Sequence, residues 1–183
     1  DAFFDWCDAH GLMVWQDMPC PGDPGKDECR DPEVFKHLKN VWSRDSFIGG
    51  TDCTMPQIWK NNFYSELAEV INAFKVFQCI VAWVPFNEAW GQSRTVEVVN
   101  RTKLADPTRI VNHASGGNHV NCFDDVMDFH NYSENPVPQT YPYPTHVVVM
   151  GEMGGLGLAI KDHTWEADGW GYRKIADGKA GSG

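Results

Sequence analysis

Apolar and polar residues alternate along this chain in blocks that predict buried strands separated by helices. The strongest block is the apolar run Ile80–Phe86, which ends abruptly in the dipeptide Asn87-Glu88. A run that is apolar at every position is typical of a strand buried on both faces, as in a parallel sheet covered by helices. The same pattern recurs at Val147–Met150, shortly before Glu152. We therefore predict two buried strands that each deliver one glutamate to the end of a sheet.

The rest of the apolar pattern predicts helices and strands in alternation. Apolar residues at helical spacing predict three helices, at Ala2–His10, Pro56–Phe77 and Arg94–Leu104. Short apolar runs predict three further strands, at Leu12–Trp15, Arg109–Asn112 and Val126–His130. Strands that alternate with helices in this way favour an α/β fold with a parallel sheet.

Turn-forming residues mark the segments for which we predict less regular structure. Met18–Thr54 is expected to be a long loop with a short helix at Asp31–Trp42, and residues 154–165 are expected to be loop. Tyr172–Ala176 is expected to begin a helix. Pro85 lies inside the central strand and lacks an N–H group for the sheet, so we predict a local irregularity there.

The charge and composition of the chain narrow the classes of partner. The 183 residues carry a formal net charge of −10, which argues against nucleic acid or an anionic membrane surface as a partner. No apolar stretch approaches the roughly 20 residues that a membrane-spanning helix needs. The chain is long enough for one domain with a core of its own.

Six cysteines are spread through the chain. Cys7 and Cys79 lie in apolar segments and are predicted to be core residues. Cys20, Cys29 and Cys53 share one polar stretch, which leaves open whether two of them form a disulfide. No CxxC or HExxH pattern occurs, so we predict no metal site and no cofactor.

The two glutamates at strand ends suit the chemistry of retaining glycoside hydrolysis. In that reaction one carboxylic acid protonates the leaving oxygen while a second carboxylate attacks the anomeric carbon, with the two groups roughly 5–5.5 Å apart. The carboxyl ends of parallel barrel strands are also where barrel enzymes keep their catalytic groups. The alternative is that Glu88 and Glu152 are ordinary surface carboxylates.

Four blocks carry a family resemblance: IVAWVPFNEAWGQ, LADPTRIVNHASG, DVMDFHNY and VVMGEMGGLGL. They resemble the catalytic domain of glycoside hydrolase family two, which includes β-galactosidases, β-glucuronidases and β-mannosidases. The resemblance implies that residues 1–183 form one incomplete catalytic domain, a partial TIM (β/α)8 barrel with approximately strands three to seven. Barrel strands one, two and eight are then missing from the chain, and we expect the fragment alone to be inactive.

The resemblance also implies roles for individual residues. Glu88 would be the general acid/base and Glu152 the nucleophile. Substrate contacts are implied for five further residues, Asn87, His130, Tyr132, Asp17 and Trp90. For the aromatic and histidine side chains among them, packing in the core is the alternative.

Two other functions remain open. In the first, the chain is a remnant of a barrel that binds carbohydrate or has a structural role and does not catalyse a reaction. In the second, it is another retaining barrel glycosidase of the same clan, similar to a β-mannanase or a cellulase. In each case the expected partner is a carbohydrate. For the two enzymes, that partner is a β-glycoside substrate. The sugar, the linkage and the oligomeric state are not readable from the sequence, and a periplasmic or extracellular location for the parent protein is only a working expectation.

Overall fold

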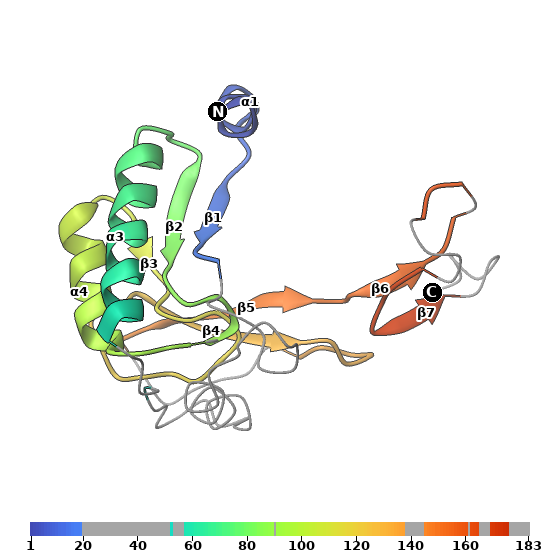
Figure 1. Cartoon of the computed structure of the whole chain (residues 1–183). Helices are drawn as coiled ribbons and strands as arrows, with labels where there is room; N and C mark the ends of the chain where they lie inside the picture. The colour runs from blue at the N-terminus through green and yellow to red at the C-terminus, as the bar shows by residue number, and fades with distance from the viewer. Residues whose placement is uncertain are drawn as a thin grey trace.

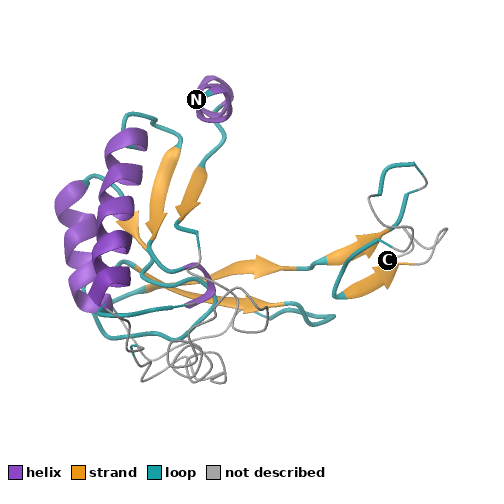
Figure 2. Cartoon of the chain, viewed as in Figure 1, coloured by secondary structure: helices purple, strands orange, loops and turns teal. Residues whose placement is uncertain are grey.

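A computed structural model of the chain describes residues 1–19, 52, 57–89, 91–137, 145–160, 162–164 and 169–175. Over these ranges the fold is mixed α/β, with three α-helices and short parallel strands in small sheets (Figures 1 and 2). The predicted α/β class with parallel strands is therefore confirmed. The predicted helix at 31–42 and Cys20, Cys29 and Cys53 lie outside the described residues.

Helix α1 spans Ala2–His10, as its apolar spacing predicts. The Asp1 carboxylate accepts the N–H of Phe3 at 3.0 Å and so caps the first turn. Gly11 ends the helix in a left-handed conformation with φ 70°, which glycine adopts without steric cost. Both predicted ends of the helix are thus confirmed.

Strand β2, Ile80–Val84, lies between β1 and β3 in a parallel three-stranded sheet. The prediction of a buried central strand is confirmed, because only one of its five residues is even partly exposed. The strand ends before Pro85, where an irregularity was predicted, and Phe86 then forms an isolated bridge to Ala114.

Of the two neighbours of β2, one is shifted along the chain and the other is shorter than the sequence predicts. Strand β1 spans Val14–Asp17, two residues later than expected, because its register with β2 begins at Val14. Strand β3 covers only Ile110–Val111.

Helices α3 (Gln57–Phe74) and α4 (Thr95–Ala105) lie side by side against β2 and β3 (Figure 1). Their buried side chains join those of the sheet in one apolar core, which includes Leu67, Ile71, Ile80, Trp83 and Val98. Both helices were predicted, although α3 ends at Phe74 rather than Phe77. Cys7 and Cys79 are buried free thiols of this core, as predicted.

Strand β4, Val126–Asn131, pairs in parallel with β5, Val147–Met153. The prediction that β5 is a fully buried strand is wrong, because Val147 is 65% exposed and the last three residues of the strand are also exposed. Strand β5 pairs with β4 alone among the described strands.

A backbone hydrogen bond links strand β3 of the first sheet to the residue that precedes β4. The N–H of Asp125, just before β4, donates to the carbonyl of Val111 in β3 at 2.9 Å. The strands β1 to β5 therefore follow one another in chain order across the described structure.

The predictions for the C-terminal part of the described chain are wrong. Leu156–Leu158, expected to be loop, forms strand β6, and Arg173–Ile175, expected to begin a helix, forms strand β7 parallel to it. A Cβ added at Gly157 would lie 2.4 Å from the carbonyl oxygen of Trp170, so only glycine permits this close approach. The β6–β7 pair extends away from α3 and α4 (Figure 1). None of the described helices is long and apolar enough to cross a membrane.

Candidate active site

Glu88 lies in a strained turn at the carboxyl end of β2. The short 3₁₀ helix η1, Asn87–Ala89, contains two residues with positive φ, Glu88 at 48° and Ala89 at 61°. Such angles are uncommon outside glycine and persist where the surroundings enforce them, often at functional sites. Here the hydroxyl of Ser115 accepts the N–H of Glu88 at 2.9 Å and helps to hold the turn.

The carboxyl ends of β4 and β5 bring two more polar side chains to the same place. His130 comes from β4 and Glu152 from β5, opposite each other in the parallel register. One carboxylate oxygen of Glu88, one ring nitrogen of His130 and one carboxylate oxygen of Glu152 all lie within 4.8 Å of one another. The structure thus brings together the two glutamates that the strand ends single out.

His130 lies between the two glutamates. Its Nδ1 is 3.3 Å from Oε1 of Glu88, and its Nε2 is 3.6 Å from Oε1 of Glu152 and 3.9 Å from Oδ2 of Asp128. Burial by itself would lower the pKa of His130, but the hydrogen bond to Glu88 and the charges of Glu152 and Asp128 outweigh it and raise that pKa. The His130 imidazole is therefore protonated more readily than a free histidine side chain.

Tyr132 contacts the second glutamate directly. Its hydroxyl forms a short hydrogen bond with Oε2 of Glu152. Burial and then the hydrogen bond to the Glu152 carboxylate raise the pKa of Tyr132, so the phenol stays protonated and donates this bond. The ring stacks on Tyr172 with 4.0 Å between centroids, which fixes its orientation.

Asp128 was not singled out by the sequence, and it supports the strand that carries Glu152. Its buried carboxylate accepts the N–H of Gly151 at 2.8 Å and the side-chain amide of Asn112 at 3.0 Å. A Cβ on Gly151 would lie 2.4 Å from Asp128, so this approach requires glycine. Burial is the main reason that the pKa of Asp128 is raised. The sequence did hold a signal for Asp128. It is an aspartate within the apolar run VMDFH, and a carboxylate that is buried in a strand needs hydrogen-bond partners.

Asp17, at the end of β1, belongs to the same region. Ser115 donates a long hydrogen bond of 3.5 Å to its carboxylate, so one serine contacts both Asp17 and Glu88. Burial, followed by the negative charges of Asp128 and Glu152, raises the pKa of Asp17 to about 6. Asp17 is thus close enough to the cluster to be affected by its charge.

An open pocket of about 640 Å³ covers the two glutamates. Its lining includes Asn87, Glu88, Tyr132, Glu152, Trp170 and Tyr172. The last two rings pack edge to face with 5.2 Å between centroids, and Trp170 is 73% exposed. No pattern in the sequence pointed to this pair. Of the predicted site residues, Trp90 lies outside the described part of the chain.

The arrangement is able to perform acid–base and nucleophilic chemistry. Two carboxylates face one space, the imidazole of His130 lies between them, and a phenol donates to one of them. The same glutamates and His130 offer oxygen and nitrogen atoms close enough to bind one cation. An aromatic wall beside the carboxylates suits the apolar face of a sugar ring.

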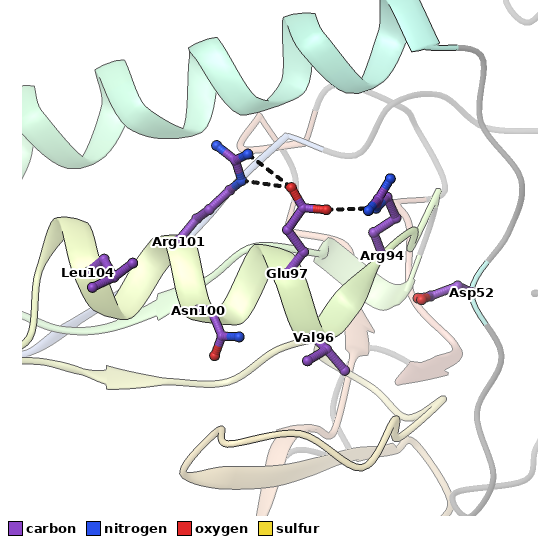
Figure 3. Close-up of a pocket in the computed structure, with 7 residues that line it drawn as sticks. All are labelled: Asp52, Arg94, Val96, Glu97, Asn100, Arg101 and Leu104. Atoms are coloured by element: carbon purple, nitrogen blue, oxygen red, sulfur yellow. Dashed lines mark hydrogen bonds and ion pairs between the residues drawn. The ribbon is translucent and has the colours of Figure 1, made fainter.

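A second pocket, along α4, has a different character. Figure 3 shows Glu97 there between Arg94 and Arg101, with N–O distances of 2.6 and 2.9 Å. The Asp52 carboxylate accepts the N–H of Thr95 at 3.1 Å and so caps the start of α4. These charged groups neutralise one another on a solvated helix face, which offers no reactive centre comparable with the glutamate pair.

Comparison with known proteins adds no relative. No protein-family model matches the chain, and no curated protein matches it either.

Proposed function

We propose that the chain carries the catalytic pair of a retaining β-glycosidase that acts on β-linked carbohydrates. The observation that carries this proposal is the separation of at most 4.8 Å between carboxylate oxygens of Glu88 and Glu152. Retaining glycosidases hold their two carboxyl groups roughly 5–5.5 Å apart, whereas inverting enzymes leave roughly 6.5–9.5 Å for a water molecule. The short separation favours retention.

In the first step Glu152 attacks the anomeric carbon. A bond forms between its carboxylate oxygen and that carbon, the bond from the carbon to the leaving oxygen breaks, and Glu88 gives its proton to the leaving oxygen. His130, 3.3 Å from Glu88, is placed to share that proton. Tyr132 donates to Oε2 of Glu152 and orients the nucleophile.

In the second step water restores the enzyme. Glu88, now ionised, accepts a proton from water, the hydroxide oxygen bonds to the anomeric carbon, and the bond to Glu152 breaks. The sugar leaves with its original anomeric configuration. Asn87 lines the pocket beside Glu88 and is our candidate for the sugar 2-hydroxyl.

For the fold we propose a partial (β/α)8 barrel in which β1 to β5 are strands three to seven. Two observations support it. The parallel order β1-β2-β3 follows the chain without reversal, with α3 and α4 as the crossovers, whereas doubly wound sheets reverse their strand order. Glu88 also follows the carboxyl end of β2, and His130 and Glu152 are the second-last residues of β4 and β5, so all three lie where barrel enzymes keep their catalytic groups.

The test is covalent labelling with a mechanism-based 2-deoxy-2-fluoro-β-glycoside that carries a good leaving group. The fluorine slows the second step, so the glycosyl ester on the nucleophile accumulates. Mass spectrometry is expected to find one label per chain, on Glu152, and none on Glu152→Gln. Because five strands do not close a barrel, the experiment is made on residues 1–183 and on any longer polypeptide from which they come.

A matched variant tests the role of Glu88. Glu88→Gln should lower turnover of a substrate with a poor leaving group by roughly 10²–10⁴-fold, the usual contribution of a general acid. Azide should restore activity with an activated substrate and yield a β-glycosyl azide, since azide needs no general base. Carbohydrate binding without a label on Glu152 in either polypeptide would contradict the enzyme and favour a noncatalytic carbohydrate-binding remnant.

A further inference from the structure

A second group of histidines lies buried around one aspartate, away from the glutamate pair. Asp124 and His146 come just before β4 and β5, and His113 and His119 come from the loop after β3. All four side chains are buried. One ligand atom each from His113, His119 and Asp124 lie within 4.8 Å of one another.

Asp124 is the centre of this group. Its Oδ2 lies 2.5 Å from Nδ1 of His113, and its Oδ1 lies 2.9 Å from Nε2 of His146. The thiol of Cys122 donates to the same Oδ1 at 3.4 Å. The N–H of Val120 donates to Nε2 of His113, so the proton of that ring is on Nδ1, facing Asp124.

We propose that this group is a zinc site, with Asp124, His119, Cys122 and His146 as ligands. Tetrahedral zinc bonds of about 2.0–2.3 Å place neighbouring ligand atoms roughly 3.3–3.8 Å apart. The separations around Oδ1 of Asp124, 2.9 Å to His146 and 3.4 Å to Cys122, are already near that range. The ion would draw His119, Cys122 and His146 around Oδ1 of Asp124 to complete the tetrahedron.

His113 orients the carboxylate in this site. It occupies Oδ2 of Asp124 through its Nδ1–H and leaves Oδ1 to face the metal. In most protein zinc sites, residues that do not bind the metal themselves hold the ligands in place by hydrogen bonds of this kind.

The two histidine ligands are able to present a lone pair. Nδ1 of His146 lies 3.0 Å from the hydroxyl of Thr145, which accepts the ring proton when Nε2 turns to the metal. The buried His119 ring packs edge to face against both His113 and His146, with 4.8 and 5.1 Å between ring centroids. Each ligand imidazole binds the metal in its neutral form.

Binding exchanges one proton for one ion. The Cys122 thiol releases its proton to solvent as the zinc–sulfur bond forms. Without metal, burial and the charge of Asp124 raise the pKa of Cys122 to about 12. The thiolate and the Asp124 carboxylate together balance the two positive charges of Zn²⁺, so the occupied site is neutral. Thiolate and imidazole ligands favour zinc over magnesium or calcium.

Cobalt provides the direct test, because Co²⁺ takes the tetrahedral geometry of zinc and reports a sulfur ligand by a near-ultraviolet charge-transfer band. The full chain is stripped with a chelator and titrated with Co²⁺ and then with Zn²⁺. We expect one Co²⁺ per chain, a thiolate band, and displacement by Zn²⁺. The absence of stoichiometric binding of either ion would overturn the proposal and leave a hydrogen-bonded polar core only.

Cys122→Ser is the variant of choice, because a serine hydroxyl can still donate to Asp124 and preserve the fold, which circular dichroism checks. It should abolish the thiolate band and weaken zinc binding at least about 10-fold. His163→Ala removes an exposed histidine and serves as the matched control, with unchanged binding expected. Equal zinc affinity of Cys122→Ser and the parent, or weakening by His163→Ala, would contradict the ligand assignment.

Discussion

Two clusters of histidine and carboxylate side chains lie at opposite ends of the β4–β5 pair. The ratio of carboxylates to imidazoles in one cluster is the reverse of that in the other. In the open cluster, three carboxylates, from Glu88, Asp128 and Glu152, surround the single imidazole of His130. In the closed cluster, three imidazoles, from His113, His119 and His146, surround the single carboxylate of Asp124.

The ratio of charges decides what each cluster is suited to do. Burial is the largest influence on the pKa of both His130 and His119, and in both it favours the neutral ring. Around His130 the carboxylates overcome burial and raise the pKa, whereas around His119 the neighbouring imidazole adds to burial and lowers the pKa to about 4. The surroundings thus favour the protonated ring at His130 in the open cluster and the neutral ring at His119 in the closed cluster.

The largest effect on stability is expected at the centre of the closed cluster. Asp124→Ala removes the acceptor of three buried donors and should lower the free energy of unfolding by about 3–5 kcal/mol. Urea unfolding followed by circular dichroism measures it. Glu88→Gln in the open cluster is the matched comparison and should change that free energy by less than about 1 kcal/mol. Similar losses for the two variants would contradict the difference between the clusters.

The closed cluster should also make the protein sensitive to acid. The pKa of His119 is about 4 in the fold against 6.5 unfolded, so the unfolded chain binds more protons between these values. Stability is therefore full above pH 6.5 and falls by up to about 3 kcal/mol as the pH drops to 4. Thermal unfolding from pH 4 to 7 measures this slope, and His119→Gln should flatten it. A variant with the parent's slope would exclude His119 as the cause.

Asp17, beside the open cluster, should show a pH dependence of the opposite sign. The pKa of Asp17 is raised to about 6 from 3.8, so its contribution to stability is greatest below pH 3.8 and is lost as the pH rises through 6. Asp17→Asn should therefore gain about 1–2 kcal/mol relative to the parent between pH 4 and pH 7, discounted for partial exposure. Urea unfolding of both proteins at the two pH values measures the gain. A loss of stability of Asp17→Asn relative to the parent between these pH values would indicate that the surroundings of Asp17 stabilise its ionised carboxylate.

The smallest effect is expected on the outer face of α4. Glu97 pairs there with Arg94 and Arg101 while all three side chains remain partly exposed (Figure 3). Glu97→Gln should lower the free energy of unfolding by only about 0.5 kcal/mol, and about 1 M salt should remove the difference. A loss of stability comparable with that of Asp124→Ala would show that the exposure of the charged side chains does not explain the different effects of the two variants.

Local pattern was sufficient for the longer elements. In α3 the spacing of Leu67 and Ile71 follows the period of a helix, and both side chains are buried. In β2 the unbroken apolar run reflects burial on both faces. Each signal is contained within neighbouring residues, so the sequence alone carries it.

The short strands depended on their partners. Leu156–Leu158 is a strand because it pairs with Arg173–Ile175, and the close approach of the two backbones requires Gly157. A three-residue segment has too little periodicity to reveal such pairing. The aromatic wall of Trp170 and Tyr172 was missed for the same reason.

By itself the sequence singled out the two glutamates of the open cluster, because Glu88 and Glu152 each follow an apolar run. It held only a faint signal for the closed cluster, in the short spacing of His119, Cys122 and Asp124. The tertiary structure decided which side chains meet and which are buried. Proton affinity depends on burial and on charges a few ångströms away, and those neighbours are contributed by strands and loops far apart in the chain.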